Sequence, residues 1–70
     1  MTVYMVLGTV EVLEFANSKM LRGWRRVHRS HNIEADTIDD AIQAYKDRYT
    51  AEKYRNAHVE AVYQQVYTEV

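Results

Sequence analysis

The fold is decided by one stretch of the chain, Ala35-Asp36-Thr37-Ile38-Asp39-Asp40-Ala41-Ile42. Asp36 and Thr37 are both good N-cap residues, because a side-chain oxygen of either can accept a hydrogen bond from the free N–H groups of a first helical turn. Thr37 and Asp40 have the spacing of a capping box, with Asp in the place of the usual Glu or Gln. The aspartates also place negative charge at the positive end of a helix dipole. We therefore predict that a helix begins at Thr37.

The residues after this start have the three- and four-residue apolar spacing of a helix that buries one face. These residues are Ile38, Ala41, Ile42, Tyr45 and Tyr49. The predicted helix runs from 37 to about 50, and the helix formers at 51–53 would allow it to continue to Tyr54. The aspartates lack the looped backbone and glycine of a calcium site, so we interpret them as a cap and a solvated first turn.

The residues before the helix favour two strands. Residues 2–15 are rich in Val, Leu, Met, Tyr and Thr, which suit a pleated sheet. Within them, Gly8 indicates a bulge or a close approach of another backbone. After a turn at 16–19, residues 24–35 predict a second strand, whose weaker apolar signal and arginines are typical of a sheet edge. A helix over 10–21 is the competing interpretation.

The residues after the helix predict a third strand. The segment 55–57 is a polar exit, with Asn56 available for a left-handed backbone conformation. We expect a strand over 58–70. Strict alternation would place Val59, Ala61, Tyr63 and Tyr67 on one face and Glu60, Val62, Gln64 and Val66 on the other.

The resulting element order is β-β-α-β, in a single small α+β domain that covers residues 1–70. The first two strands form an antiparallel hairpin, and a right-handed helical crossover returns the third strand to the sheet. We expect a three-stranded antiparallel sheet of spatial order 2-1-3, with one helix packed on one face. The other face stays open, and an uncovered, partly apolar sheet face is typical of an interaction surface.

Length and composition exclude several classes of protein. Seventy residues bury a thin core, which makes a homodimer one alternative. The hydrophobic fraction of 47% is too high for a disordered chain, and the absence of Cys excludes disulfides and thiolate metal sites. No apolar run approaches the ~18 residues of a membrane span. The first residues lack the basic region of a signal peptide, so the expected location is the cytoplasm.

The polar residues form no catalytic or metal-binding motif. His28 and His31 are three apart, which on a strand places them on opposite faces, so we expect no metal site. There is no Gly-x-Ser-x-Gly elbow, and two glycines do not make a phosphate loop. We therefore expect a protein that is not an enzyme and needs no cofactor.

The strongest local feature is a basic segment with an aromatic residue at its centre. Between Phe15 and Ile33 the chain has five lysines and arginines and no acidic residue. The predicted partner-binding residues are Arg22, Trp24, Arg25, Arg26 and Arg29.

Three interpretations of this segment stay open. Trp and Arg are enriched at protein-binding hot spots, which favours an acidic protein surface as the partner. The same residues would bind phosphates and stack a base, although an isoelectric point near 6.3 is low for a dedicated nucleic-acid binder. In the third interpretation the arginines pair with the chain's own acidic helix start, at Asp36, Asp39 and Asp40.

The helix start also resembles that of a known family. The matching residues are Ala35, Thr37, Asp39 and Ala41, between a strand that ends in Ile33-Glu34 and the strand Val59-Glu60-Ala61-Val62. This Ala-x-Thr-x-Asp-x-Ala start, within roughly residues 9–63, resembles very small phage-encoded β-β-α-β host-takeover proteins. Among these are the short podophage inhibitors of bacterial RNA polymerase, which contact the polymerase partly through strand arginines and acidic residues.

The resemblance implies a function in the host cytoplasm. The expected protein binds a bacterial protein complex and inhibits or redirects it, and RNA polymerase is the first candidate. Two alternatives remain beside it. One is a nucleic-acid-binding protein that uses the basic segment, and the other is a structural homo-oligomer.

Overall fold

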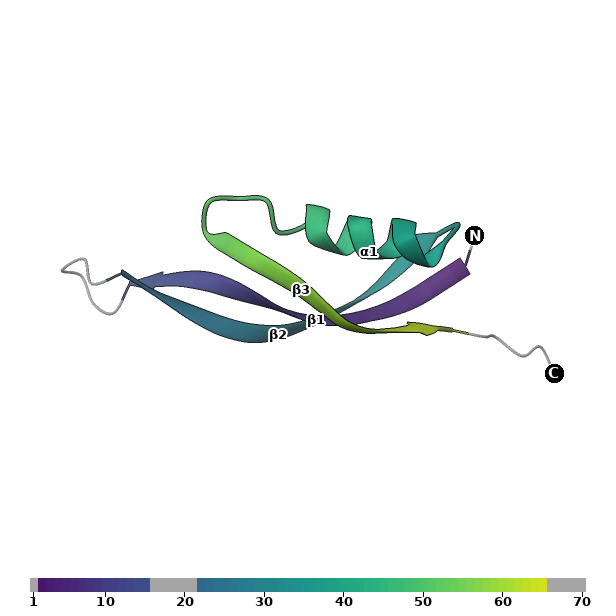
Figure 1. Cartoon of the computed structure of the whole chain (residues 1–70), viewed down its shortest axis with the longest axis horizontal. Coiled ribbons are helices and arrows are strands. Elements are labelled where there is room, and N and C mark those ends of the chain that lie inside the picture. The colour runs from purple at the N-terminus through teal and green to yellow at the C-terminus, as the bar shows by residue number, and fades with distance from the viewer. Residues whose placement is uncertain (1, 16–21, 66–70) are drawn as a thin grey trace.

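The computed structural model describes residues 2–15 and 22–65 and confirms the predicted fold (Figure 1). The elements are β1 (Thr2–Phe15), β2 (Arg22–Ala35), α1 (Ile38–Asp47) and β3 (Tyr54–Gln64). They form a three-stranded antiparallel sheet of order β2-β1-β3, with the helix on one face. The competing helix over 10–21 is wrong for residues 10–15, which belong to β1. The turn at 16–19 and the strand residues after 65 lie outside the described residues.

The central strand β1 pairs differently with its two neighbours. Its register with β2 is continuous from Thr2 opposite Ala35 to Phe15 opposite Arg22. Its register with β3 is shifted twice. Figure 1 shows the strong twist of the sheet and the way in which β1 and β2 extend together past the end of α1.

The first shift changes which β3 side chains face the helix. It lies between Leu7 and Gly8 and leaves Glu60 as an extra residue of β3. Val59 and Val62 therefore both pack against the core. Strict alternation along β3, which places these two valines on opposite faces, was wrong because a bulge adds one residue to the strand.

The second shift contains the left-handed residue. It lies between Thr9 and Glu11, and Asn56 there has a φ of 53°. The predicted left-handed conformation of Asn56 is confirmed, but it serves a bulge within β3 and not the end of the helix. The strand accordingly begins at Tyr54, four residues before the expected start at His58.

The helix begins as predicted and ends early. Thr37 is the N-cap, and its hydroxyl accepts from the Asp40 N–H at 3.1 Å. The last helical residue is Asp47, where the sequence predicts an end near 50. The helix does not continue to Tyr54, which is instead the first residue of β3. The chain must turn after Asp47 so that β3 can return to the edge of β1. Ile38 is half exposed rather than part of the buried helix face.

The core lies between α1 and the sheet. Its buried residues are Tyr4, Val6, Ile33, Ala35, Ala41 and Tyr45. The predicted close approach at Gly8 is confirmed, because a Cβ there would lie 2.2 Å from the carbonyl oxygen of His58. Among the described residues no helix has the length and apolar character needed to cross a membrane.

An aromatic group extends the core toward the end of the helix. His31 packs against both Tyr45 and Tyr49, with ring centroids 5.6 and 5.8 Å away, and its ring nitrogen Nε2 is hydrogen-bonded to the Tyr49 hydroxyl. Tyr49 in turn meets the ring of Tyr54 edge-on at 5.1 Å. Burial, with smaller contributions from Arg48 and Arg29, lowers the pKa of His31 from its usual 6.5, so this imidazole is neutral at neutral pH.

Candidate interaction surface

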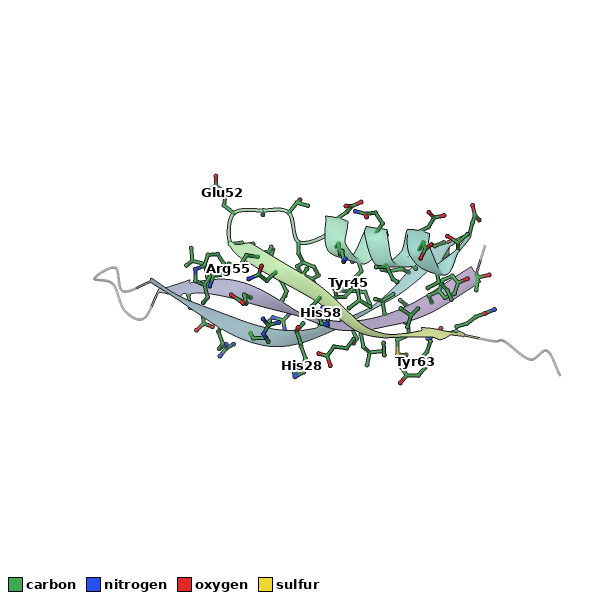
Figure 2. All side chains as sticks on the ribbon, in the orientation of Figure 1. His28, Tyr45, Glu52, Arg55, His58 and Tyr63 are labelled. Atoms are coloured by element: carbon green, nitrogen blue, oxygen red, sulfur yellow. The ribbon has the colours of Figure 1, made fainter. Side chains whose placement is uncertain are left out.

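The sheet face opposite α1 is the candidate surface. Figure 2 shows Tyr45 between the helix and the sheet, whereas His28 and Tyr63 project on the other side. The register and the alternation of strand side chains assign five β1–β2 pairs to this open face. They are Met5–Asn32, Leu7–Ser30, Thr9–His28, Glu11–Arg26 and Leu13–Trp24. No described element covers them.

One carboxylate on the central strand joins the two outer strands. Arg55 of β3 donates from Nε to Glu11 Oε2 at 2.6 Å, and Arg26 of β2 donates from Nη2 to Glu11 Oε1 at 3.1 Å. Asn56 Nδ2 donates to the same Oε1 at 3.3 Å. The second nitrogen of the Arg26 fork, Nη1, donates to Thr9 Oγ1 at 2.9 Å. Glu11 thus positions an arginine on each side of β1.

This network carries one net positive charge. The hydrogen bonds from Arg55 and then Asn56 lower the pKa of Glu11 from its usual 4.5, so the carboxylate is ionised at neutral pH. Two guanidinium groups therefore face one carboxylate, with one positive charge in excess. Both arginines keep about half of their side-chain surface exposed, at 52% for Arg26 and 49% for Arg55.

Trp24 is held in place by the same network. The guanidinium carbon of Arg55 lies 4.1 Å from the centre of the indole ring, which is cation–π geometry. The indole is 37% exposed, a large value for a tryptophan. Because Glu11 fixes Arg55 and Arg55 covers one part of Trp24, the indole is ordered before any partner arrives. We call Glu11, Trp24, Arg26 and Arg55 the Trp24 cluster.

The structure divides the predicted partner-binding residues between two faces. Trp24 and Arg26 lie together on the open face. Arg25 and Arg29 fall on the face that carries α1, since their β1 partners are Val12 and Gly8. Arg22 begins β2, and its side chain lies outside the described part of the chain.

The predicted pairing of the basic segment with the acidic helix start was wrong. In the described ranges, no ion pair joins an arginine of β2 to Asp36, Asp39 or Asp40. Arg26 pairs with Glu11, and Arg25 Nε lies 3.0 Å from Glu14 Oε1. The reason is geometric, because the hairpin register brings the acidic residues of β1 to the arginines, while the helix start follows the far end of β2.

Three residues of this network, Glu11, Arg55 and Asn56, are not among the predicted partner-binding residues. Glu11 had a partial signal, because it is one of two acidic residues in a largely apolar strand, but its position opposite Arg26 depends on the register of the hairpin. Arg55 and Asn56 had none, since their position opposite Glu11 depends on the bulge at Asn56.

A second polar feature of the open face lies near its middle. His28 Nδ1 is 3.8 Å from Glu60 Oε1, across the backbone of Gly8. These residues border a shallow hollow of about 180 Å³. The prediction that His28 and His31 point to opposite faces is confirmed. In residues 2–15 and 22–65, no three His, Asp or Glu side chains are grouped as metal ligands would be.

The fold and this surface define a class, a small β-β-α-β domain with one open sheet face. Comparison with protein-family models, with curated proteins and with solved structures finds no match for the chain.

Proposed function

We propose that this chain is a non-catalytic protein-binding domain that docks on a bacterial protein complex and inhibits or redirects it. The observation that carries the proposal is the stacking of Arg55 on Trp24 on an uncovered sheet face. Tryptophan and arginine dominate binding hot spots because they bury large areas and make several polar contacts at once. Here both are ordered in advance, which reduces the entropy lost on binding.

The charge of the Trp24 cluster indicates the kind of surface it fits. An excess positive charge next to an indole complements an acidic protein surface that has an apolar pocket. RNA polymerase is the first candidate, because the helix start Ala35–Thr37–Asp39–Ala41 resembles that of phage inhibitors of this enzyme. The bacterial cytoplasm is the corresponding location.

The test is to capture a partner on the intact chain and to compare its binding to matched variants of the chain. The intact chain is immobilised and exposed to bacterial lysate and, separately, to purified bacterial RNA polymerase. We expect a stoichiometric partner whose affinity falls about 30-fold or more for Trp24→Ala, as for a hot-spot residue. Tyr63→Ala is the control, since Tyr63 is also aromatic, exposed and on the open face. Recovery of no stoichiometric partner would contradict the proposal, and normal transcription in the presence of the chain would remove the polymerase version.

A nucleic acid is the second candidate for the same cluster. An exposed indole beside guanidinium groups is the combination that stacks bases and contacts phosphates. This alternative predicts binding to single-stranded DNA or RNA at low salt, with an affinity that falls steeply as salt is added. Absence of binding at low salt removes it.

A homo-oligomer is the third candidate, with the open face or the strand edges as the contact. It predicts a mass above that of the 8.3 kDa chain in sedimentation equilibrium at high concentration. A monomer under those conditions excludes it.

A further inference from the structure

The free edge of β2 is the longest regular feature of the molecule without a described partner. β2 lies at the end of the sheet order and spans fourteen residues. Its register with β1 contains no bulge, whereas β3, at the opposite edge, is bulged at Glu60 and Asn56. Bulges protect an edge from pairing with another chain. The β2 edge lacks that protection and is regular enough to accept a further strand.

The backbone groups that face outward can be assigned. Along a strand, the N–H and C=O groups of successive residues point to alternate sides. Leu13 N–H donates to Lys53 and the Val3 carbonyl accepts from Gln65, so the odd-numbered residues of β1 face β3. The even-numbered ones then face β2, where their partners are odd-numbered. Trp24, Arg26, His28, Ser30 and Asn32 consequently turn their own N–H and C=O groups to the outside.

Arg29 supports this assignment and marks the edge chemically. Its Nη1 donates to the carbonyl oxygen of His28 at 2.9 Å, which places a guanidinium group along the outward side of the strand. No carboxylate of the described residues pairs with Arg29, unlike Arg25 and Arg26. An incoming carboxylate would gain a bidentate contact there.

The charge along the edge selects the partner. From Arg22 to Ile33 there is no acidic residue, and the arginines occur on both sheet faces, with Arg26 on the open one and Arg25 and Arg29 on the other. A second copy of β2 would bring like charges together, which is unfavourable directly across a strand pair. An extended segment with acidic side chains on both of its faces has the complementary charge.

We propose that the outer edge of β2, over Trp24–Asn32, binds an extended acidic peptide segment as a fourth strand of the sheet. The segment supplies main-chain hydrogen bonds to the outward groups of β2, and its carboxylates contact the exposed parts of Arg25 and Arg26. A carboxylate of the segment also binds Arg29 in place of the His28 carbonyl, which frees that oxygen for the new strand. This inference rests on the proposed function and names its binding mode, which is strand addition by an acidic stretch of the partner next to the Trp24 cluster.

The test uses the intact chain and a short synthetic peptide of alternating Glu and Val. Strand addition predicts slower hydrogen exchange at the outward amides of Arg26, His28 and Ser30, with little change at Val27 and Arg29, which already bond to β1. Arg29→Glu is expected to weaken binding at least about tenfold. Lys46→Glu, which makes the same charge change on the outside of α1, is the matched control and should bind within about twofold of the wild type.

Two controls separate strand addition from simple charge attraction. The first is a peptide with N-methyl groups on alternate amides, placed on the side that faces β2, compared with the same groups on the other side. The second is Ser30→Pro, which removes an outward N–H, as an edge position allows. Methyl groups on the side that faces β2 are expected to abolish binding, and so is Ser30→Pro. The peptide comparison uses the unaltered protein, so no folding defect can affect it. Equal binding of the two methylated peptides, or equal binding of a matched Lys and Val peptide, would overturn the inference.

The outcomes also distinguish this inference from the proposed function. A partner that is captured through Trp24 and is insensitive to Ser30→Pro leaves the proposed function standing and removes strand addition. Protection of the outward amides by the acidic peptide, together with no captured partner, supports the edge site and removes the proposed function.

Discussion

The hydroxyl of Tyr45 lies directly over Gly8. A Cβ on residue 8 would be 2.8 Å from that hydroxyl oxygen, and the same hydroxyl donates to the Arg29 carbonyl at 3.0 Å. Arg29 is the β2 partner of Gly8. The missing side chain of Gly8 therefore creates the space in which the helix anchors its one fully buried tyrosine to the sheet.

We expect Gly8→Ala to lower the free energy of unfolding by at least about 2 kcal/mol, because the added methyl group meets backbone and cannot be accommodated by a side-chain rotation. Urea denaturation measures the change. Gly23→Ala is the control, since nothing lies within 4 Å of a Cβ at Gly23. Equal stabilities of the two variants would contradict the packing described for Gly8.

Tyr45→Phe isolates the hydrogen bond to the Arg29 carbonyl. It removes only the hydroxyl from a side chain with 0% exposure, so we expect a loss of about 1 kcal/mol. Tyr63→Phe removes the hydroxyl from a 58% exposed ring and is expected to leave the stability unchanged. Thermal unfolding of both variants checks the difference, and a loss of the same size in both would argue against a buried bond.

Thr37→Ala removes the N-cap oxygen that accepts from the Asp40 N–H. The expected cost is about 1 kcal/mol of stability. Thr37→Ser keeps the hydroxyl and should restore most of it. Circular dichroism during thermal unfolding follows both, and an unchanged Thr37→Ala variant would show that the first turn of α1 does not need this cap.

The lowered pKa of Glu11 predicts that the folded protein loses stability in acid. Because the folded-state pKa of Glu11 lies below its usual 4.5, the carboxylate contributes stability that is fully present above about 4.5 and is lost as pH falls through the folded value. Glu11→Gln should be less stable than the wild type at neutral pH and should lose less stability on acidification. Melting temperatures across this range test the slope, with Glu14→Gln as a matched variant that leaves the Glu11 network intact.

The lowered pKa of His31 predicts a second loss of stability on acidification, at a higher pH than that of Glu11. Its pKa is lowered by burial among Tyr45 and Tyr49, and by the positive charges of Arg48 and Arg29, so the unfolded chain takes up a proton more readily than the folded one. The neutral His31 ring contributes stability that is fully present above pH 6.5 and is lost as pH falls through the lower pKa of the folded state. His31→Gln should remove this dependence. An NMR titration in which the His31 ring protonates at or above 6.5 would contradict it.

The local signals of the sequence predict this fold well. The cap at Thr37, the apolar strand 2–15 and the crossover rule are sufficient for β-β-α-β and the order β2-β1-β3. The end of the helix depends on tertiary packing, because residues 48–53 are acceptable helix formers that must instead turn the chain back toward β1.

The candidate surface was predictable only in part. Alternation along a strand is sufficient to place Trp24 and Arg26 on one face, as the structure has them. The contributions of Arg55 and Asn56 depend on a bulge in β3. The residue type of Asn56 predicts its left-handed conformation, but not that this conformation lies within a strand. The partners of the arginines depend on pairing between strands, which is why Arg25 pairs with Glu14 and Arg26 with Glu11, and neither with the acidic helix start.

The central position of β1 has a consequence for the order in which the molecule assembles. β1 meets β2 through a local hairpin, whereas its pairing with β3 joins Tyr4 to Gln64 across nearly the whole described chain. Closing such a long loop costs entropy before its contacts form, so we expect β3 to pair with β1 after the β1–β2 hairpin has formed. Until β3 docks, Glu11 lacks Arg55 and the indole of Trp24 lacks its guanidinium. On this expectation, the Trp24 cluster is completed only when β3 joins the sheet.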